Sequence, residues 1–387
     1  MGSGRVHPGA DGRPEASRGV AMAGLATAGR IGQGAGAAVG IPAALSLVLA
    51  LHSSSAERTR AMGVWGAVAG AGSLVGVFLG GTLIGMLGWQ AVFVTPVSFG
   101  LIGAIIVWRS APPAPGRPGR FDLPGAIAVT VAISALALGM VAAAETGWGA
   151  PGTVAGLAAG LATLVAFVTV ERRSAHPLVP LGVFRRGPVV LANVVVLLIG
   201  GTLTSLFFFL PQSQQQVLGM SPTAAGTAQL PIAVMIIVGS AAAPPLAKRI
   251  GPARALPVAL VVLLAGFVWL ALDRTAGGFS LTLLGAFVLI GAGLGLGAVT
   301  ATAMAVRDSA EGESGLLSGL VNAAQQLGGA VGLAALAGIA IGTAGAGEDI
   351  AFTTAFLGQA ALILIALGLS LVPTVKTRPD PASAGTR

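Results

Sequence analysis

Residues 255–272 read ALPVALVVLLAGFVWLAL, an unbroken apolar run without a charged side chain. A bilayer core of about 30 Å is crossed by a helix of about 20 such residues. Because lipid offers no hydrogen-bonding partner, the backbone amides of a spanning segment must bond within that segment. A continuous apolar run of this length therefore predicts a membrane-spanning helix. Spanning strands are not expected, since they alternate apolar and polar residues.

The same pattern recurs along the chain and predicts a polytopic membrane protein with about eleven spans. The expected spans are residues 22–50, 61–87, 90–108, 123–143, 151–170, 189–211, 224–246, 255–272, 280–305, 315–341 and 351–372. Of all residues, 55% are hydrophobic and only 9% are charged, whereas about a quarter are charged in an average soluble domain. No water-soluble fold hides this much apolar surface. The 60 glycines agree with this class, because small residues let spanning helices approach closely.

The rare residue types exclude several kinds of site. The chain has no cysteine, so neither a disulfide framework nor a cysteine-based metal centre is possible. His7, His52 and His176 lie in the leader or in loops and have no partner at metal-ligand spacing. No glycine-rich phosphate loop with a following Lys-Ser or Lys-Thr is present, so ATP is not the implied energy source. The sequence therefore predicts no cofactor.

Basic residues fall almost wholly into alternate loops. One set of loops, with the C-terminal tail, holds Arg58, Arg60, Arg109, Arg117, Arg120, Arg172, Arg173, Arg185, Arg186, Lys248, Arg249, Arg254, Arg307, Lys376, Arg378 and Arg387. The other set holds only Arg274. Because Lys and Arg near span ends are retained inside the cell, the first set and the C-terminus are expected to be cytoplasmic. The net charge of +8 is scattered over short loops, so anionic lipid headgroups, and not nucleic acid, are the expected counter-charge.

An arginine stands inside the first expected span. At such a depth it costs roughly 2.5–3.5 kcal/mol on insertion scales unless it is paired or faces water. The stretch that contains it, Arg30-Ile31-Gly32-Gln33-Gly34-Ala35-Gly36-Ala37-Ala38, resembles the fourth-helix motif of the major facilitator superfamily, in its fourteen-span drug:proton antiporter branch. The resemblance implies a role in the substrate path or in coupling for Arg30 and Gln33, and a conformational role for Gly34.

The second expected span continues the resemblance. Residues 72–81, GSLVGVFLGG, look like the antiporter motif of the family's fifth helix, which the glycines Gly72, Gly76, Gly80 and Gly81 carry. In this family a Gly-Pro pair bends that helix and packs it against the opposite half, which seals a leak path. Val77 stands where the family usually has proline. Helix packing alone is an equal alternative, because glycine ladders pack any helix pair.

A short basic loop carries a third resemblance. Residues 239–245, which begin with Gly239, are followed by Lys248, Arg249, Gly251 and Arg254. This pattern resembles the loop between the second and third helices of a family repeat, which acts as a conformational latch on the cytoplasmic side. Ordinary retention of basic residues inside the cell is the alternative.

Residues 210–231 and 315–332 also match the branch, so the resemblance covers about residues 22–372 in family order, beginning at the fourth helix. It implies an all-α integral membrane fold, a major-facilitator-like bundle that lacks the first three family helices. With eleven spans and a cytoplasmic C-terminus, the N-terminus would lie outside the cell. Arg5, Arg13 and Arg18 would then lie on the side where basic residues are rare, and this agrees with the expectation that helices are missing before them.

The expected organisation follows the family's triplets of helices. It comprises a disordered leader 1–21, a partial N-terminal bundle of three spans 22–110, a Pro-rich linker 111–120, two extra spans with a cytoplasmic loop 121–188, a C-terminal six-helix bundle 189–373 and a disordered tail 374–387.

Amide side chains mark the expected substrate path. Asn322, Gln325 and Gln326 stand three and four residues apart and share one face of the helix 315–341. Lining a substrate path is one interpretation, and amide bonding between helices is the other. For Asn193, early in the span 189–211, interhelical bonding is favoured over ligand contact.

Proton coupling requires a titratable group exposed alternately to each side, yet all 13 carboxylates lie in the leader, loops, tail or span ends. Glu145, just past the outer end of a span, is the nearest candidate, and a solvated loop residue is the alternative. The resembling family carries its acidic residue in the first helix, which is not in this chain.

The resemblance implies a secondary transporter and not an enzyme. It predicts proton-driven efflux of drugs or other small amphipathic molecules by alternating access, with a small-molecule substrate, protons and the lipid bilayer as partners. The chain has only two lysines against 19 arginines and is very rich in Ala and Gly. This composition is associated with a high-GC bacterium, which implies the plasma membrane as the location. A truncated, non-transporting membrane fragment or partner subunit is the alternative hypothesis.

Overall fold

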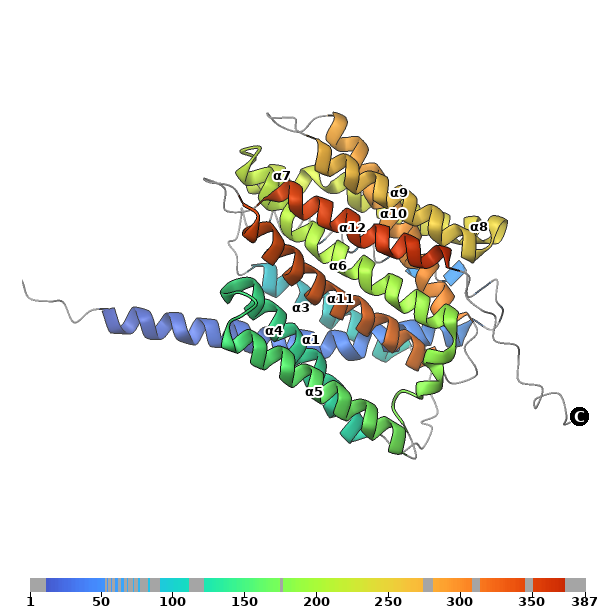
Figure 1. Ribbon diagram of the computed structural model, residues 1–387, viewed down its shortest axis with the longest axis horizontal. Helices are drawn as coiled ribbons and strands as arrows, with labels where there is room; N and C mark the ends of the chain where they lie inside the picture. Colours follow the sequence, from blue (N-terminus) through green and yellow to red (C-terminus); the bar gives the residue numbers. More distant parts are fainter. Residues whose placement is uncertain are drawn as a thin grey trace, which may run out of the picture.

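The computed structural model describes residues 12–52, 91–110, 122–174, 177–273, 281–307, 314–344 and 351–372, with isolated positions between 54 and 83. Within these residues every regular element is helical. The elements, labelled as in Figure 1, are α1 (Gly12–Leu51), α3 (Ala91–Ser110), α4 (Leu123–Thr146), α5 (Pro151–Arg173), the 3₁₀ helix η1 (Leu181–Arg185), α6 (Gly187–Gln216), α7 (Pro222–Ala228), α8 (Leu230–Ile250), α9 (Pro252–Leu272), α10 (Leu281–Val306), α11 (Ser314–Gly342) and α12 (Phe352–Leu371).

The helices fall on the apolar runs predicted from the sequence. Among the described residues, 8 helical segments are long and apolar enough to cross a membrane, and Val94–Arg109 is a shorter apolar segment. Large apolar side chains are exposed on many of these helices, as expected where the solvent is lipid. The all-α membrane fold class is thereby confirmed. The predicted span 61–87 lies mostly outside the described residues.

The first helix is longer than predicted. α1 begins at Gly12, inside the leader 1–21 that the sequence predicts to be disordered. Once a helical turn exists, each added residue gains one hydrogen bond for the backbone freedom that it loses, so a helix extends beyond its apolar part. Pro14 is compatible with this start, because the first turn needs no N–H donor.

The predicted span 224–246 is divided into α7 and α8 at Gln229. Pro231 lacks the N–H that a continuous helix requires, so the helix breaks just before it. The side chain of Gln229 satisfies the break, because its Nε2 donates to Ala225 O at 3.2 Å and to Oε1 of Gln214 on α6 at 3.1 Å. The break is therefore tied to the neighbouring helix.

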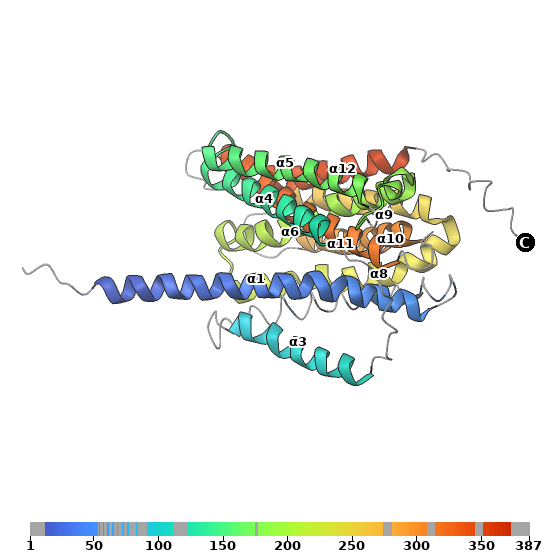
Figure 2. The same cartoon turned by 90° about the horizontal axis from the view of Figure 1, so that it is seen from below.

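The C-terminal helices enclose the main hydrophobic core. α10 packs against α8 and α9, α6 packs against α11 and α12, and α12 also packs against α9. The core draws its buried residues from α6 and from α8 to α12. The hairpin of α4 and α5 joins this bundle through α11. Figure 2 shows α1 and α3 on one side of the bundle, with α3 outermost.

Glycines set the distance between α6 and α11. Gly200 of α6 lies against the carbonyl of Gln325, and Gly328 of α11 lies against the carbonyl of Leu197, so that a Cβ at either position would overlap backbone. A Cβ at Gly201 would stand 2.9 Å from Gly328 O. Lipid tails provide no hydrophobic force between helices, so close backbone packing of this kind drives their association.

We expect Gly328→Ala to destabilise the protein by about 1–3 kcal/mol, because the added methyl group forces α6 and α11 apart. Thermal unfolding of the purified chain in detergent measures the effect. Gly319→Ala on the same helix is the matched control, since a Cβ there meets nothing within 4 Å. Equal midpoints for the two variants would contradict the close contact.

Candidate functional site

A row of amide side chains runs along α11 at membrane depth. Asn322, Gln325 and Gln326 share one face of this helix because of their spacing. Asn322 and Gln325 are half-buried and Gln326 is exposed. Within the described part of the chain, no hydrogen bond is recorded for these side chains. Amide bonding between helices is therefore not seen among the described residues, and lining of a substrate path stays a prediction.

α6 carries buried polar atoms that also lack partners. Asn193 is 8% exposed, its Nδ2 donates to Val189 O of the same helix at 2.8 Å, and its Oδ1 accepts no hydrogen bond. The interhelical bond favoured for Asn193 is thus absent among the described residues. Ser205, also on α6, has a buried Oγ without a hydrogen-bond partner among the described residues. An unpaired buried acceptor costs about 1–3 kcal/mol, so these atoms are suited to bind water or a ligand.

Sequence reasoning missed two further buried polar side chains. Gln359 of α12 is fully buried, and neither of its side-chain polar atoms has a partner among the residues that the structure describes. Thr300 of α10 is 2% exposed, and its Oγ1 also has no partner within this described part. A lone amide in the apolar run 351–372 is the signal that marks Gln359. Thr300 gives no such signal, because a helical threonine normally bonds the carbonyl one turn before it.

The first-span motif lies on the helix beside this stripe. α1 packs against α11, and Gln33 and Gly34 lie on an exposed part of α1. The structure therefore brings the helix that carries Arg30 next to the helix that carries Gln325. The Arg30 side chain lies outside the described residues.

The glycines of the second span are only partly described. Gly72 and Gly76 are helical and exposed, and a Cβ at either meets nothing within 4 Å among the described residues. Gly80 and Gly81 lie outside the described residues. The conformational role predicted for this motif stays a prediction.

Gly239 has a direct packing role between α8 and α10. It faces the carbonyl of Ala292 so closely that a Cβ would overlap this group. Gly291 and Gly295 of α10 approach the backbone of α8 in the same way. The two helices therefore meet over a shared glycine surface, as α6 and α11 do.

The predicted basic loop is a tight turn between α8 and α9. Lys248 and Arg249 are exposed in the last turn of α8, and Arg254 is exposed in the first turn of α9. Gly251 joins the two helices with φ 82° and ψ 148°. This conformation is essentially restricted to glycine, so the sharp reversal depends on this residue.

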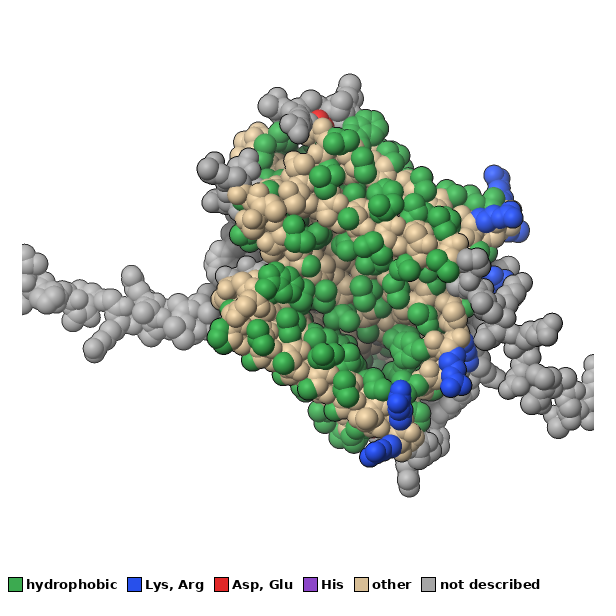
Figure 3. Space-filling model, viewed as in Figure 1, with side chains coloured by type: hydrophobic (Ala, Val, Ile, Leu, Met, Phe, Trp, Pro, Cys, Tyr) green, Lys and Arg blue, Asp and Glu red, His purple; other side chains and the backbone are tan. Residues whose placement is uncertain are grey.

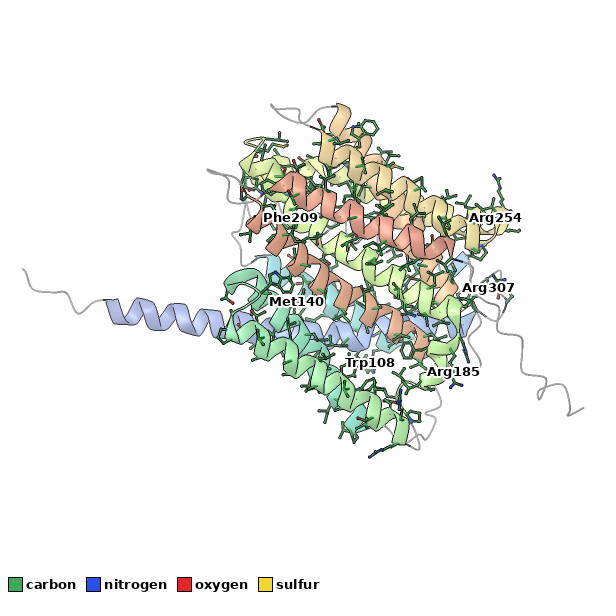
Figure 4. The ribbon with its side chains drawn as sticks, in the orientation of Figure 1. Trp108, Met140, Arg185, Phe209, Arg254 and Arg307 are labelled. Carbon is green, nitrogen blue, oxygen red and sulfur yellow. The ribbon has the colours of Figure 1, made fainter. Side chains whose placement is uncertain are left out.

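The basic side chains gather at one end of the bundle. Figure 3 shows the Lys and Arg side chains of this face together at one end. Figure 4 places Arg185, Arg254 and Arg307 there, from η1, α9 and the residue after α10. We call this the basic end. Three of the basic loops that the sequence predicts to be cytoplasmic thus lie at the same end of the molecule.

The described carboxylates lie at helix ends. Asp122 caps α4, where its Oδ1 accepts the Gly125 N–H at 3.0 Å, and Glu171 stands in the last turn of α5. The side chain of Glu145 lies outside the described residues. Within the part that the structure describes, no group of three or more His, Cys, Asp or Glu side chains could hold a metal ion.

The helical membrane fold agrees with the comparison to known proteins. Residues 19–333 match the model of the Major Facilitator Superfamily. The chain belongs to this superfamily.

Several bacterial proteins that are named for drug export or drug resistance are similar to the chain. It is 34% identical over 374 residues to the cephamycin export protein of Amycolatopsis lactamdurans. The aligned stretch covers 93% of this chain and 77% of that protein. It is 38% identical to the puromycin resistance protein of Streptomyces alboniger, over 81% of this chain and 63% of that protein. It is 32% identical to the tetracenomycin C resistance and export protein of Streptomyces glaucescens, over 79% of this chain and 57% of that protein.

These relatives confirm the predicted resemblance to the drug-exporting branch of the superfamily. The chain spans between 57% and 77% of the length of the relatives named here. It is a multi-pass membrane protein of a transporter family, and not of an enzyme family.

We expect Gly251→Ala to cost about 1–3 kcal/mol of stability, since alanine is strained at this φ and ψ. Thermal unfolding in detergent measures the loss. Gly149→Ala is the control, because Gly149 is also a loop glycine but has no positive φ and no neighbour within 4 Å. A variant as stable as the control would show that the α8–α9 turn tolerates a side chain.

Proposed function

We propose that the chain is a secondary active transporter that exports drugs or other small amphipathic molecules in exchange for protons by alternating access. The α11 stripe carries this proposal, because Asn322, Gln325 and Gln326 present amide groups at membrane depth without a side-chain hydrogen bond among the described residues. Polar groups in a bilayer are costly unless they meet a partner or line a cavity. A passing substrate and its water supply that partner.

The neighbours of the stripe fit a transport path. α11 is adjacent to α1, which carries Gln33, and to α6, which carries the unpaired Oδ1 of Asn193. Transporters of this architecture bind their substrate near the midplane, between helices of different repeats. Amide groups beside apolar surface suit amphipathic molecules, because such pockets combine a hydrophobic lining with a few polar contacts.

The names of the relatives support the substrate class. Proteins similar to the chain over most of its length are named for the export of cephamycin and of tetracenomycin C, or for resistance to puromycin. Export of antibiotic-like molecules is accordingly the substrate class that we propose. The plasma membrane of a bacterium is the proposed location, with the basic end and the C-terminus in the cytoplasm.

We propose the proton gradient as the energy source, as the resemblance to the drug:proton antiporter branch implies. Arg30 lies within α1 and is the charge that the sequence places deepest in a predicted span. A positive charge inside a span is costly unless it is paired or faces water, so a residue of this kind marks a functional site. We therefore assign to Arg30 a role in coupling substrate binding to proton movement.

We expect bacterial cells without their own drug exporters to extrude a cationic dye when they produce the chain, and an uncoupler to stop this efflux. Arg30→Ala is expected to abolish efflux, and Gln325→Leu to reduce it roughly tenfold, as the loss of one polar contact predicts. Arg173→Ala, at an exposed arginine in the last turn of α5, is the control. The amount of each variant in the membrane is measured in parallel.

The outcomes separate the competing hypotheses. Unchanged efflux in Arg30→Ala would assign this arginine to structure. No efflux from the unmodified chain, at normal amounts in the membrane, would favour the non-transporting fragment or partner subunit.

The orientation is testable directly, because the chain has no cysteine of its own. We expect Ser174→Cys, after α5, to react with a membrane-impermeant maleimide only in inside-out vesicles. Gly149→Cys, between α4 and α5, is expected to react from outside in intact cells. The reverse pattern would place the basic end outside.

A further inference from the structure

A second apolar cluster lies apart from the main core. It contains one buried residue from each of several elements: Leu45 of α1, Val183 of η1, Val189 of α6, Val306 of α10 and Leu317 of α11. Their exposed fractions are 4%, 2%, 6%, 6% and 1%. Trp65, Leu316 and Leu320 pack against it. We call this group the end cluster.

The end cluster lies at the basic end. Val183 is two residues from Arg185, and Val306 is followed by Arg307, and Figure 4 places both arginines there. Leu317 stands in the first turns of α11, on the same helix as the amide stripe but nearer to this end. The cluster therefore lies between the stripe and the space beyond the basic end.

The cluster joins two groups of helices that the main core does not join. Leu45 belongs to α1, whereas the main core draws its buried residues from α6 and from α8 to α12. α1 packs against α11, and Leu45 of the end cluster is the buried apolar side chain that the described part of α1 brings to that junction. When the two groups separate at the basic end, these contacts must be broken.

Val183 enters this junction from outside both groups. It belongs to η1, which follows the α4–α5 hairpin and leads directly into α6. The neighbouring Phe184 points away and is 47% exposed. The 3₁₀ turn therefore presents one side chain to the cluster and the next to the surroundings.

A carboxylate of α5 holds the segment before η1. Glu171 is 3% exposed, and its Oε1 and Oε2 accept the backbone N–H groups of Leu178 and Val179, each at 3.2 Å. Gly125 of α4 faces the same carboxylate, since a Cβ there would stand 2.7 Å from Oε1. Hydrogen bonds to a charged acceptor are stronger than neutral ones, so the hairpin fixes the path of the chain into η1.

The hairpin also contacts α11 at the opposite end. α4 packs along α11, and Trp148, just after α4, lies beside Gly338 of α11. The hairpin is thus in contact with the stripe-bearing helix near one end and delivers Val183 to the end cluster near the other.

We propose that the end cluster is the seal that closes the substrate path at the basic end, and that the α4–α5 hairpin takes part in gating by seating Val183 in it through Glu171. The proposal rests on the proposed alternating-access transport. With Val183 seated, water and substrate reach the stripe only from the other side. Opening at the basic end withdraws Val183 from Leu45.

Single-cysteine labelling tests the seal without requiring transport. Gln325→Cys, about two turns beyond Leu317 on α11, serves as the reporter. Its reaction with a membrane-impermeant maleimide is followed in inside-out vesicles that contain the full chain. We expect Val183→Ala in the reporter background to raise the labelling rate roughly tenfold, since two buried methyl groups are lost from the closed state. Phe184→Ala is the matched control and is expected to leave the rate within about twofold.

Two more variants keep the test independent of folding defects. Val183→Thr keeps the shape of the side chain but brings a hydroxyl into a position that is 2% exposed, so it is expected to raise the labelling rate. Its thermal midpoint in detergent, compared with that of Val183→Ala, shows whether the fold is retained. Glu171→Gln loses the charged acceptor and is expected to raise the rate less than Val183→Ala. Together with Val183→Ala it should add little, because both changes act on the same contact.

Equal labelling rates for Val183→Ala, Val183→Thr and Phe184→Ala would overturn the seal. A fully multiplicative effect of Glu171→Gln and Val183→Ala would overturn the link to the hairpin. The dye-efflux assay is read separately. Efflux without any Val183 effect on labelling defeats this inference alone, whereas a clear Val183 effect without efflux defeats the proposed function and leaves the seal in place.

Discussion

The inability of lipid to hydrogen-bond the backbone is the constraint on which this structure depends. Each spanning segment must satisfy its own amides, so the described chain is helical and its outer faces are apolar. The same solvent gives helices no hydrophobic reason to associate. Contact between them therefore relies on glycines that let backbones meet, as Gly200 and Gly328 do, and on the few polar atoms that lipid would leave unpaired.

Polar groups inside the bundle divide into satisfied and unsatisfied ones. The side-chain amide of Gln229 donates hydrogen bonds to Gln214 and to the backbone before the helix break, and these bonds stabilise the kink. The amides of Asn322 and Gln325 have no such use, and neither has Oδ1 of Asn193. The buried Oδ1 of Asn193 is costly without a partner, and in the proposed function the substrate and its water supply partners to this set.

The spans were predictable because hydropathy is a property of consecutive residues. The helices from α4 to α12 lie on the predicted runs, and the amide stripe follows from spacing alone. Contacts between distant segments leave no such trace. Val183 is an ordinary valine in a loop until η1 turns it into the end cluster, and Glu171 looks like a solvated helix end until Leu178 and Val179 fold back onto it. The break at Gln229 has a local cause in Pro231. This proline predicts a kink, but it does not predict that Gln229 bonds to Gln214 of α6.

The glycine contact between α6 and α11 has a mechanical consequence. Side chains that change rotamer can absorb a displacement, but two backbones in direct contact at Gly201 and Gly328 have nothing to rearrange. A force on α11 is consequently passed to α6 almost without loss, and from α6 into the adjoining turn at Arg186. In the proposed transport cycle the two helices therefore move as one rigid unit, which links the amide stripe of α11 to the turn before α6 whatever the shape of the substrate.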